Sequence, residues 1–269
     1  MELAQLKEKA RWIWRETVRV HGLAPETRVA SSLSDVEIFT TLYYGGILRH
    51  KHGDPDWVER DRMIVSKGHG GISLYPILAD IGYFPLAELD RICTESSFLG
   101  SIPDHIPGFE TINGSLGHGP GVGCGLAVAL RAKKSDSRVY VLCGDGEMNS
   151  GAVWEAIMFA AFHKLGNMTL IVDDNEISML GFQKDILGLS PLAEKLKAFH
   201  WEVQEVDGHD IPALLDVLRP LARRQDGPPQ AIVARTIKGR GAPQLENKPL
   251  CHVMNLSKED IRSLLGEEK

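Results

Sequence analysis

Cysteine is scarce in this chain of 269 residues, and the few that occur are not arranged for chemistry. Four cysteines stand far apart, and no two of them have the C-x-x-C spacing of a zinc or redox site. Their spacing does not suggest a disulfide framework either. Cys143 ends an apolar run and is expected to be an inert core residue.

Long apolar runs and patches of one charge are also missing. No stretch approaches the roughly 18 apolar residues of a membrane span, and the N-terminus mixes charges into its apolar positions without a cleavage pattern. The net charge is −6 and the basic residues are scattered, which argues against a nucleic-acid surface. We therefore expect a soluble cytoplasmic protein that binds neither membranes nor nucleic acids.

What the chain does have is a regular alternation of strand and helix signals. Helices are predicted over 3–20 and from a capping-box pattern at 34–37 to about 48. After residue 60, strands are predicted at 63–66, 139–143, 168–173, 201–206 and 230–235, and helices at 72–81, 123–133, 151–164, 190–199 and 211–224. Glycines and prolines crowd 100–123, 236–256 is expected to be a long ordered loop, and Ser257 caps a final helix. The pattern predicts one α/β domain over 1–269, with a mostly parallel sheet, helices on both faces and the helices of 1–60 as an embellishment.

Two polar clusters follow two of the predicted strands. Asp145, between Gly144 and Gly146, and Asn175 are thirty residues apart, and each comes directly after an apolar run. Either cluster alone could be a turn or a strand-end cap. Together they place oxygen ligands at the carboxyl ends of neighbouring parallel strands, where open α/β sheets bind ligands. Asp145, the Asn175 side chain and the Ile177 carbonyl would give Mg²⁺ three oxygen ligands, and a diphosphate and water would complete six. Oxygen ligands alone do not distinguish Mg²⁺ from Ca²⁺ or Mn²⁺.

Further motifs occur in an order that resembles the transketolase family. The segments 144–147 and 173–178 resemble its thiamine-diphosphate motif, and the others are Ser66-Lys67-Gly68-His69-Gly70, Pro103-Asp104-His105, 114–119, 201–210, Thr236-Ile237-Lys238-Gly239, Glu246-Asn247 and His252. The resemblance covers roughly residues 5–265 and extends only to the N-terminal half of a full-length transketolase. It implies the thiamine-diphosphate-binding fold.

The resemblance also implies roles for individual residues. Asp145, Asn175 and the Ile177 carbonyl would bind the metal, and the Gly146 N–H would face the cofactor's diphosphate. The remaining cofactor and catalytic candidates are His69 and His252 at the diphosphate or substrate, Gly114 and Leu116 beside the aminopyrimidine, and His105 at the donor's hydroxyls. Neutral imidazoles can relay protons to and from sugar hydroxyls. His209, at a predicted strand end, is expected to be structural.

The chain departs from the family pattern at Arg28. The family usually has Gly-His-Pro-Gly before Ser-Leu-Ser. In this chain residues 27–34 read TRVASSLS, which places Arg28 at the position of the family's histidine. Arginine stays charged and cannot relay a proton, but it can clamp a carboxylate, phosphate or sulfonate. We therefore expect a substrate with an anionic group near Arg28; the alternative is that Arg28 points to solvent.

A second departure is length. In the family, a glutamate on a pyrimidine-binding domain activates the cofactor, and the 269 residues do not contain that domain. The resemblance thus implies a separately encoded partner, an α2β2 assembly and transfer of a two-carbon ketol unit from a ketose-type donor to an aldehyde. The alternatives are the α-subunit of a 2-oxo acid dehydrogenase, a deoxyxylulose-phosphate-type synthase, or a non-catalytic cofactor-binding protein. A nicotinamide enzyme is improbable, because the glycine-rich run at 114–119 lacks both a preceding strand and the G-x-G-x-x-G spacing.

Overall fold

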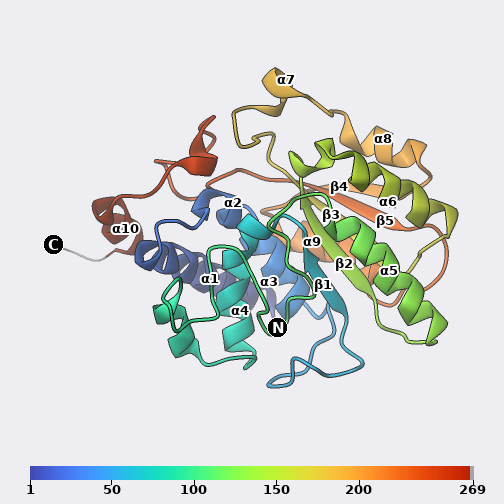
Figure 1. Cartoon of the computed structure of the whole chain (residues 1–269), viewed down its shortest axis with the longest axis horizontal. Helices are drawn as coiled ribbons and strands as arrows, with labels where there is room; N and C mark the ends of the chain where they lie inside the picture. The colour runs from blue at the N-terminus through green and yellow to red at the C-terminus, as the bar shows by residue number, and fades with distance from the viewer. Residues whose placement is uncertain (267–269) are drawn as a thin grey trace.

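The centre of the protein is a five-stranded parallel sheet with the strand order β1-β2-β3-β5-β4 (Figure 1). The computed structural model describes residues 1–266. The strands are β1 (Arg62–Val65), β2 (Val139–Gly144), β3 (Met168–Asp174), β4 (Glu202–Asp207) and β5 (Gln230–Arg235). All five predicted strands are confirmed, each to within one residue at either end.

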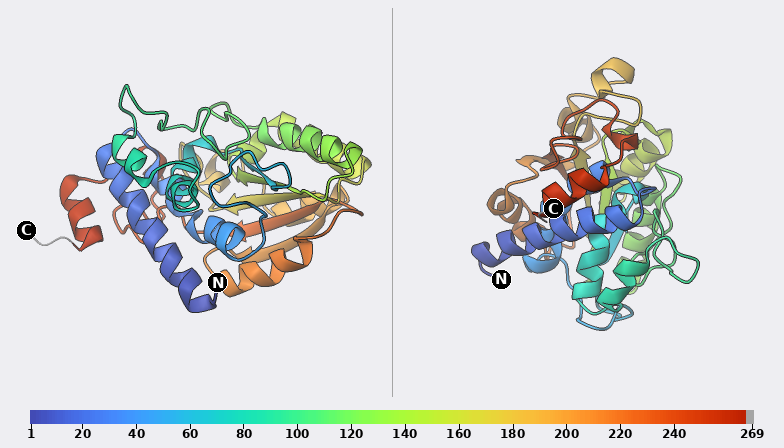
Figure 2. Two further views of the ribbon diagram at one scale, coloured as in Figure 1. Left: turned by 90° about the horizontal axis from the view of Figure 1, so that it is seen from below. Right: turned by 90° about the vertical axis from the view of Figure 1, so that its left-hand side faces the viewer.

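Helices cover both faces of the sheet, as the alternation of strands and helices predicted. One face carries α5 (Gly119–Ala132), α6 (Gly151–Phe162) and α8 (Leu192–Ala198), and the other carries α1 (Leu3–Leu23), α3 (Val36–Tyr44), α4 (Leu74–Asp80) and α9 (Ile211–Leu218) (Figures 1 and 2). Successive strand residues point to opposite faces. In β2, Tyr140 and Leu142 therefore enter one apolar core, while Val139, Val141 and Cys143 enter the other.

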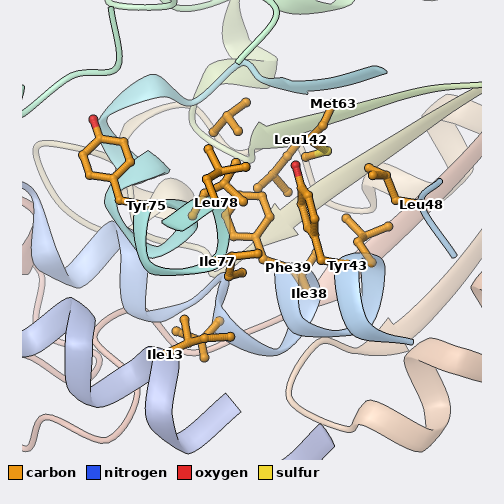
Figure 3. Close-up of a cluster of buried hydrophobic side chains, with 14 of the residues drawn as sticks. Ile13, Ile38, Phe39, Tyr43, Leu48, Met63, Tyr75, Ile77, Leu78 and Leu142 are labelled. Carbon is orange, nitrogen blue, oxygen red and sulfur yellow. The ribbon is translucent and has the colours of Figure 1, made fainter. Parts of the chain in front are cut away.

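The N-terminal helices form a wall of the first core. Figure 3 shows Ile13 of α1 and Phe39 of α3 pointing toward the same apolar interior as Leu78 of α4 and Met63 of β1. All four side chains are at most 2% exposed. The helices of 1–60 are thus an integral part of the fold and not an addition at its surface.

The remaining elements are short or lie at the edges. They are α2 (Val29–Leu33), α7 (Gln183–Ile186), α10 (Lys258–Leu265) and the 3₁₀ helices η1 (Gly68–Ser73), η2 (Leu86–Arg91), η3 (Glu147–Asn149), η4 (Arg219–Leu221) and η5 (Cys251–Val253). The predicted cap of the final helix is confirmed, because Ser257 and Asp260 form a capping box at α10. No helix among residues 1–266 is both long and apolar enough to cross a bilayer.

The predicted capping box at 34–37 is wrong. The helix α3 begins at Val36 with Asp35 as its N-cap residue, and no side chain caps it. The Ser34 hydroxyl instead donates to Asp173 Oδ2 at 2.8 Å and approaches the Ser31 carbonyl at 3.0 Å. The strong hydrogen bond to the buried carboxylate fixes the Ser34 side chain in an orientation in which its oxygen does not cap α3.

Glycine lets α5 pack closely on the sheet. A Cβ atom at Gly123 would lie 2.7 Å from Val141 Cγ2 of β2, whereas a Cβ at Gly125, two residues on in the same helix, would meet nothing within 4 Å. Gly123 is buried and Gly125 is exposed. The close approach of α5 to β2 therefore requires glycine at position 123 and not at 125.

The substitution Gly123→Ala is expected to destabilise the chain by about 1–3 kcal/mol through overpacking. The matched substitution Gly125→Ala should stabilise it by about 0.5–1 kcal/mol, because alanine removes the helix cost of glycine without a clash. Urea unfolding of both variants measures the difference, and equal effects at the two positions would contradict the packing argument.

Candidate cofactor site

A cavity of about 430 Å³ lies at the carboxyl ends of the sheet strands. Segments that directly follow β1, β2, β3 and β5 line it, together with the glycine-rich loop before α5 and the 3₁₀ helix η5. The lining residues include eight that the sequence singled out, namely His69, Gly114, Leu116, Asp145, Gly146, Asn175, Ile177 and His252. Cavities of about 540 and 760 Å³ are larger, and the first of them also has Asp145 in its lining, but neither is lined by His69 or His252.

Asp145, which lines this cavity, has one carboxylate oxygen without a hydrogen-bond partner within residues 1–266. Its Oδ1 accepts a hydrogen bond from the Gly146 N–H at 2.7 Å, while Oδ2 is buried and has no hydrogen-bond partner. Burial and the neighbouring charge of Asp173 raise the pKa of Asp145 to about 7. An unpaired oxygen of this kind is costly to bury, and a bound cation would offset that cost.

Asn175 and Ile177 supply the other oxygen atoms of the predicted metal site. The Asn175 amide nitrogen donates to Asp173 Oδ2 at 2.9 Å, and its Oδ1 accepts from the Ile177 N–H at 3.2 Å. The Ile177 carbonyl accepts from Lys238 Nζ at 2.6 Å. Amide and carbonyl oxygens have two lone pairs each, so both groups retain acceptor capacity.

The donor set suits a hard cation held partly by a phosphate. It combines one carboxylate, one amide oxygen and one backbone carbonyl, and Mg²⁺ usually completes such a set with phosphate oxygens and water. No group of three or more His, Cys, Asp or Glu side chains gathers as a metal site anywhere in residues 1–266. The orphaned Oδ2 of Asp145 is the observation that fits a cation here.

His69 and His252 form a pair on one wall of the cavity. Their ring centroids are 4.7 Å apart at an interplanar angle of 70°, and His252 Nδ1 lies 3.2 Å from the Ser31 hydroxyl. Burial and the adjacent cations, of which Lys238 is one, lower the pKa of His252 to about 4. Burial and the same cationic surroundings lower the pKa of His69 well below its ordinary value. Both imidazoles are therefore neutral at physiological pH and able to accept a proton or a hydrogen bond.

A buried ion pair lies beneath the metal-site residues. Lys67 Nζ contacts the carboxylates of Asp173 and Asp35, and all three side chains are at most 3% exposed. Burial alone would lower the pKa of Lys67, but the two negative charges raise it. Burial raises the pKa of Asp35 well above its ordinary value, whereas Lys67 and the donors around Asp173 hold the pKa of Asp173 below its usual range. Lys67 and Asp173 thus form the charged pair.

Comparison with known proteins identifies the family of this chain. Residues 28–267 match the family described as "Transketolase, thiamine diphosphate binding domain". The chain belongs to the transketolase family. It is 36% identical to the "6-deoxy-6-sulfo-D-fructose transketolase subunit SqwG" of Clostridium sp. (strain MSTE9), over 97% of this chain and 95% of the relative. It is 37% identical to an apulose-4-phosphate transketolase subunit of Actinobacillus succinogenes, over 98% and 96% of the two chains.

Full-length transketolases are matched over less than half of their length. Human transketolase is 34% identical over 99% of this chain and 42% of its own. The crystal structure of transketolase from Campylobacter jejuni superposes with a TM-score of 0.91 at 28% identity, covering 99% of this chain and 43% of that one. The chain is thus a transketolase-like transferase subunit with the thiamine-diphosphate-binding fold.

Two residues that the transketolase resemblance singled out do not line the cavity. The His105 side chain is 86% exposed and lies 3.4 Å from Asp104. Arg28 is half-buried at the N-cap of α2, yet it is close enough for its charge to lower the pKa of both His69 and His252. His209, expected to be structural, is bound on both ring nitrogens, by Glu37 at 2.9 Å and by the Ile237 N–H at 2.8 Å.

Three charged residues that line the candidate site had no predicted role. Lys67 lies in the motif of residues 66–70 and Lys238 in that of residues 236–239, and neither lysine was given a role. Both side chains are buried and line the cavity. Glu147 is 3% exposed and accepts from the Ser66 hydroxyl and from the N–H groups of Gly117 (2.7 Å) and Gly144 (3.3 Å). Glu147 thereby ties the glycine-rich loop to the end of β2. The only feature of the sequence that could have indicated this role is the position of Glu147 directly after Gly144-Asp145-Gly146.

The substitution Lys67→Met is expected to destabilise the chain by about 3–5 kcal/mol, because it leaves Asp173 as a buried charge without a partner. Lys51→Met, which breaks the exposed pair of Lys51 with Asp54, should cost less than about 1 kcal/mol. Chemical unfolding at pH 7.5 compares them, and a Lys67 variant as stable as the Lys51 variant would refute the buried pair.

The substitution Asp145→Asn is expected to stabilise the cofactor-free chain by about 1–3 kcal/mol, since it removes a buried charge with an unpaired oxygen. The pKa of Asp145 is higher in the folded than in the unfolded chain, so its penalty grows as the pH rises from about 4 to 7 and is constant above. The stability that Asp145→Asn gains over the wild type should therefore increase between about pH 4 and 7 and stay constant above, and melting curves at several pH values measure it. A gain that is independent of pH would contradict the assignment.

Proposed function

We propose that this chain binds thiamine diphosphate through a divalent cation and acts in a two-chain transketolase. The assembled enzyme would transfer a two-carbon ketol unit from a ketose-type donor to an aldehyde. The observation that carries the proposal is the convergence of Asp145, Asn175 and Ile177 with His69 and His252 in a single cavity. The three oxygen donors suit a metal diphosphate, and the two neutral imidazoles suit proton transfer.

In this proposal Asp145, Asn175 and the Ile177 carbonyl hold Mg²⁺, and Ca²⁺ or Mn²⁺ can take its place. Lys238, which is 4% exposed, donates to the Ile177 carbonyl and contributes a positive charge to the cavity wall. Its charge favours a diphosphate at the same place. The Gly146 N–H, which donates to Asp145 Oδ1 at 2.7 Å in this structure, would face the diphosphate.

The histidine pair provides for proton movement. When bound, thiamine diphosphate supplies the electron sink for cleavage of a carbon–carbon bond next to a carbonyl. His252 is held at Nδ1 by Ser31, which leaves Nε2 to exchange a proton with a substrate hydroxyl. His69 stands against it edge to face, and their depressed pKa values keep both rings in the base form. Gly114 and Leu116 also line the cavity, and in this proposal they lie beside the aminopyrimidine.

The partner in this proposal is a separately encoded chain with the pyrimidine-binding domain. Both relatives matched over 95–96% of their length are named as subunits. Apolar side chains at the mouth of the cavity are exposed, with Leu116 at 37%, Met179 at 57% and Leu180 at 71%. Burying them under a second chain would favour association.

A further exposed apolar face on α5 and α6 suits contact between two copies of this chain in an α2β2 assembly. It includes Val122, Val128, Met158, Phe159 and Phe162.

Arg28 is the proposed determinant of substrate charge. Its guanidinium acts on His69 and His252 from outside the cavity lining, so a substrate held at the imidazoles could extend an anionic group to it. The names of the two relatives specify a sulfo and a phosphate substrate. We therefore propose a sugar substrate with a terminal sulfonate or phosphate.

Mixing the two chains tests the shared site. Thiamine diphosphate and Mg²⁺ should bind tightly, and ketol transfer should occur, only when both chains are present, because the isolated cavity supplies contacts to one end of the cofactor. Calorimetry and a coupled transketolase assay measure the two properties. Full activity of this chain alone would refute the two-chain proposal.

Substituting Arg28 tests the substrate charge. In the assembled enzyme, Arg28→His should lower kcat/KM for 6-deoxy-6-sulfo-D-fructose or D-fructose 6-phosphate about 10- to 100-fold, the effect of losing one charge-assisted hydrogen bond. Turnover of D-fructose should change far less. Arg28→Lys should have an intermediate effect, because lysine keeps the positive charge but cannot bind an anion through two parallel N–H groups. An unchanged ratio of anionic to neutral turnover would show that Arg28 does not contact the substrate.

A further inference from the structure

A second cavity, of about 760 Å³, lies apart from the cofactor cavity. It is formed by one side of α1, the start of α9 and the loop residues Arg240 and Gly241. Arg240 is two residues beyond Lys238, which lines the cofactor cavity. The two cavities have no lining residue in common.

Positive side chains dominate this second cavity. Lys7, Arg11 and Arg15 follow one another at intervals of four along α1, so they lie on the same side of the helix, and all three are exposed. No carboxylate in residues 1–266 forms a salt bridge with any of the three, and Arg15 donates to the Leu265 carbonyl at 2.7 Å. Like charges at this spacing cost a helix a few tenths of a kcal/mol per pair. A bound anion would remove that cost.

The two carboxylates that line the cavity already have partners. Glu37 pairs with His209 at 2.9 Å, and Asp210 caps α9 by accepting from the Ala213 N–H at 3.3 Å. Arg240, the fourth cation, is 3.5 Å from Glu246. Four cationic and two anionic side chains line the cavity, and counting Glu246 beside Arg240 leaves an excess of one positive charge, in a chain whose net charge is −6.

An aromatic ring lies among these cations. The Trp14 indole N–H donates to the Arg240 carbonyl at 2.8 Å, which fixes the ring between α1 and the loop. The backbone of Gly241 packs against the ring, since a Cβ there would be 3.0 Å from Trp14 Nε1. Guanidinium groups bind phosphate oxygens in pairs, and an indole offers an apolar wall to a ring or a sugar.

We propose that this cavity is a second ligand site and that it takes a small organic phosphate monoester, such as a nucleotide. Arg11, Arg240 and Lys7 bind the phosphate, and Trp14 contacts the organic part. The proposal is independent of the transketolase chemistry, because it uses none of the residues of the cofactor cavity.

Calorimetry of the full chain tests the proposal with AMP as the probe. The partner chain, thiamine diphosphate and Mg²⁺ are present in excess, so that the cofactor cavity is occupied and AMP cannot report on it. AMP should bind with a stoichiometry of one per chain, more tightly than inorganic phosphate, and the binding should weaken with added salt. Adenosine, which lacks the phosphate, should give no saturable heat.

Paired variants locate the binding. Arg11→Gln combined with Arg240→Gln should raise the Kd for AMP at least about tenfold, since two charge-assisted contacts are lost. Arg223→Gln, an exposed arginine that does not line the cavity, should change it less than about twofold; melting temperatures verify that all variants fold. The proposal is overturned if the chain gives no AMP heat, if adenosine binds as tightly, or if the double variant binds AMP like the wild type. Binding of an acidic polypeptide in place of AMP would also overturn it, by indicating a protein contact.

Discussion

The carboxylate of Asp173 is the interaction on which the site depends. It is fully buried at the end of β3 and accepts hydrogen bonds from Lys67, Ser34, Asn175 and Thr236, which come from four separate segments of the chain. The positive charge of Lys67 makes the buried carboxylate tolerable, and the carboxylate in turn orients the amide of Asn175. Because both amide hydrogens belong to the nitrogen, the bond to Asp173 determines where the Asn175 oxygen points. The proposed metal ligand Asn175 is thus positioned by Asp173, which is not itself a proposed ligand.

The fold was largely predictable from the sequence, for a physical reason. The strands β1, β2, β3 and β5 are short buried apolar runs bounded by polar or glycine residues, and this pattern located them. The edge strand β4 is mostly polar and largely exposed. The errors occurred where a tertiary contact replaced a local one. The pattern at 34–37 matches a capping box, but Ser34 turns away from the helix to the buried Asp173, a partner 139 residues away that no local pattern reveals.

The cofactor site was predictable to the extent that its residues directly follow strands or belong to short motifs. Asp145, Asn175, His69 and His252 come from four different segments, and the structure brings them to one cavity. Lys67 and Lys238 were not assigned a role, because a lysine in a sequence is normally exposed and only the fold shows that these two are buried. His105 is the opposite case: its motif suggested a place in the site, yet its side chain faces solvent in the isolated chain.

The central claim is that this chain alone carries the cation and diphosphate half of the cofactor site. A crystal structure of the chain with Mn²⁺ and inorganic pyrophosphate tests it most directly, since the anomalous signal of Mn²⁺ locates the ion. We expect one strong peak about 2.1–2.2 Å from Asp145 Oδ2, Asn175 Oδ1 and the Ile177 carbonyl oxygen, with pyrophosphate completing the coordination. A peak at any other place, or pyrophosphate bound away from Asp145, would contradict the claim.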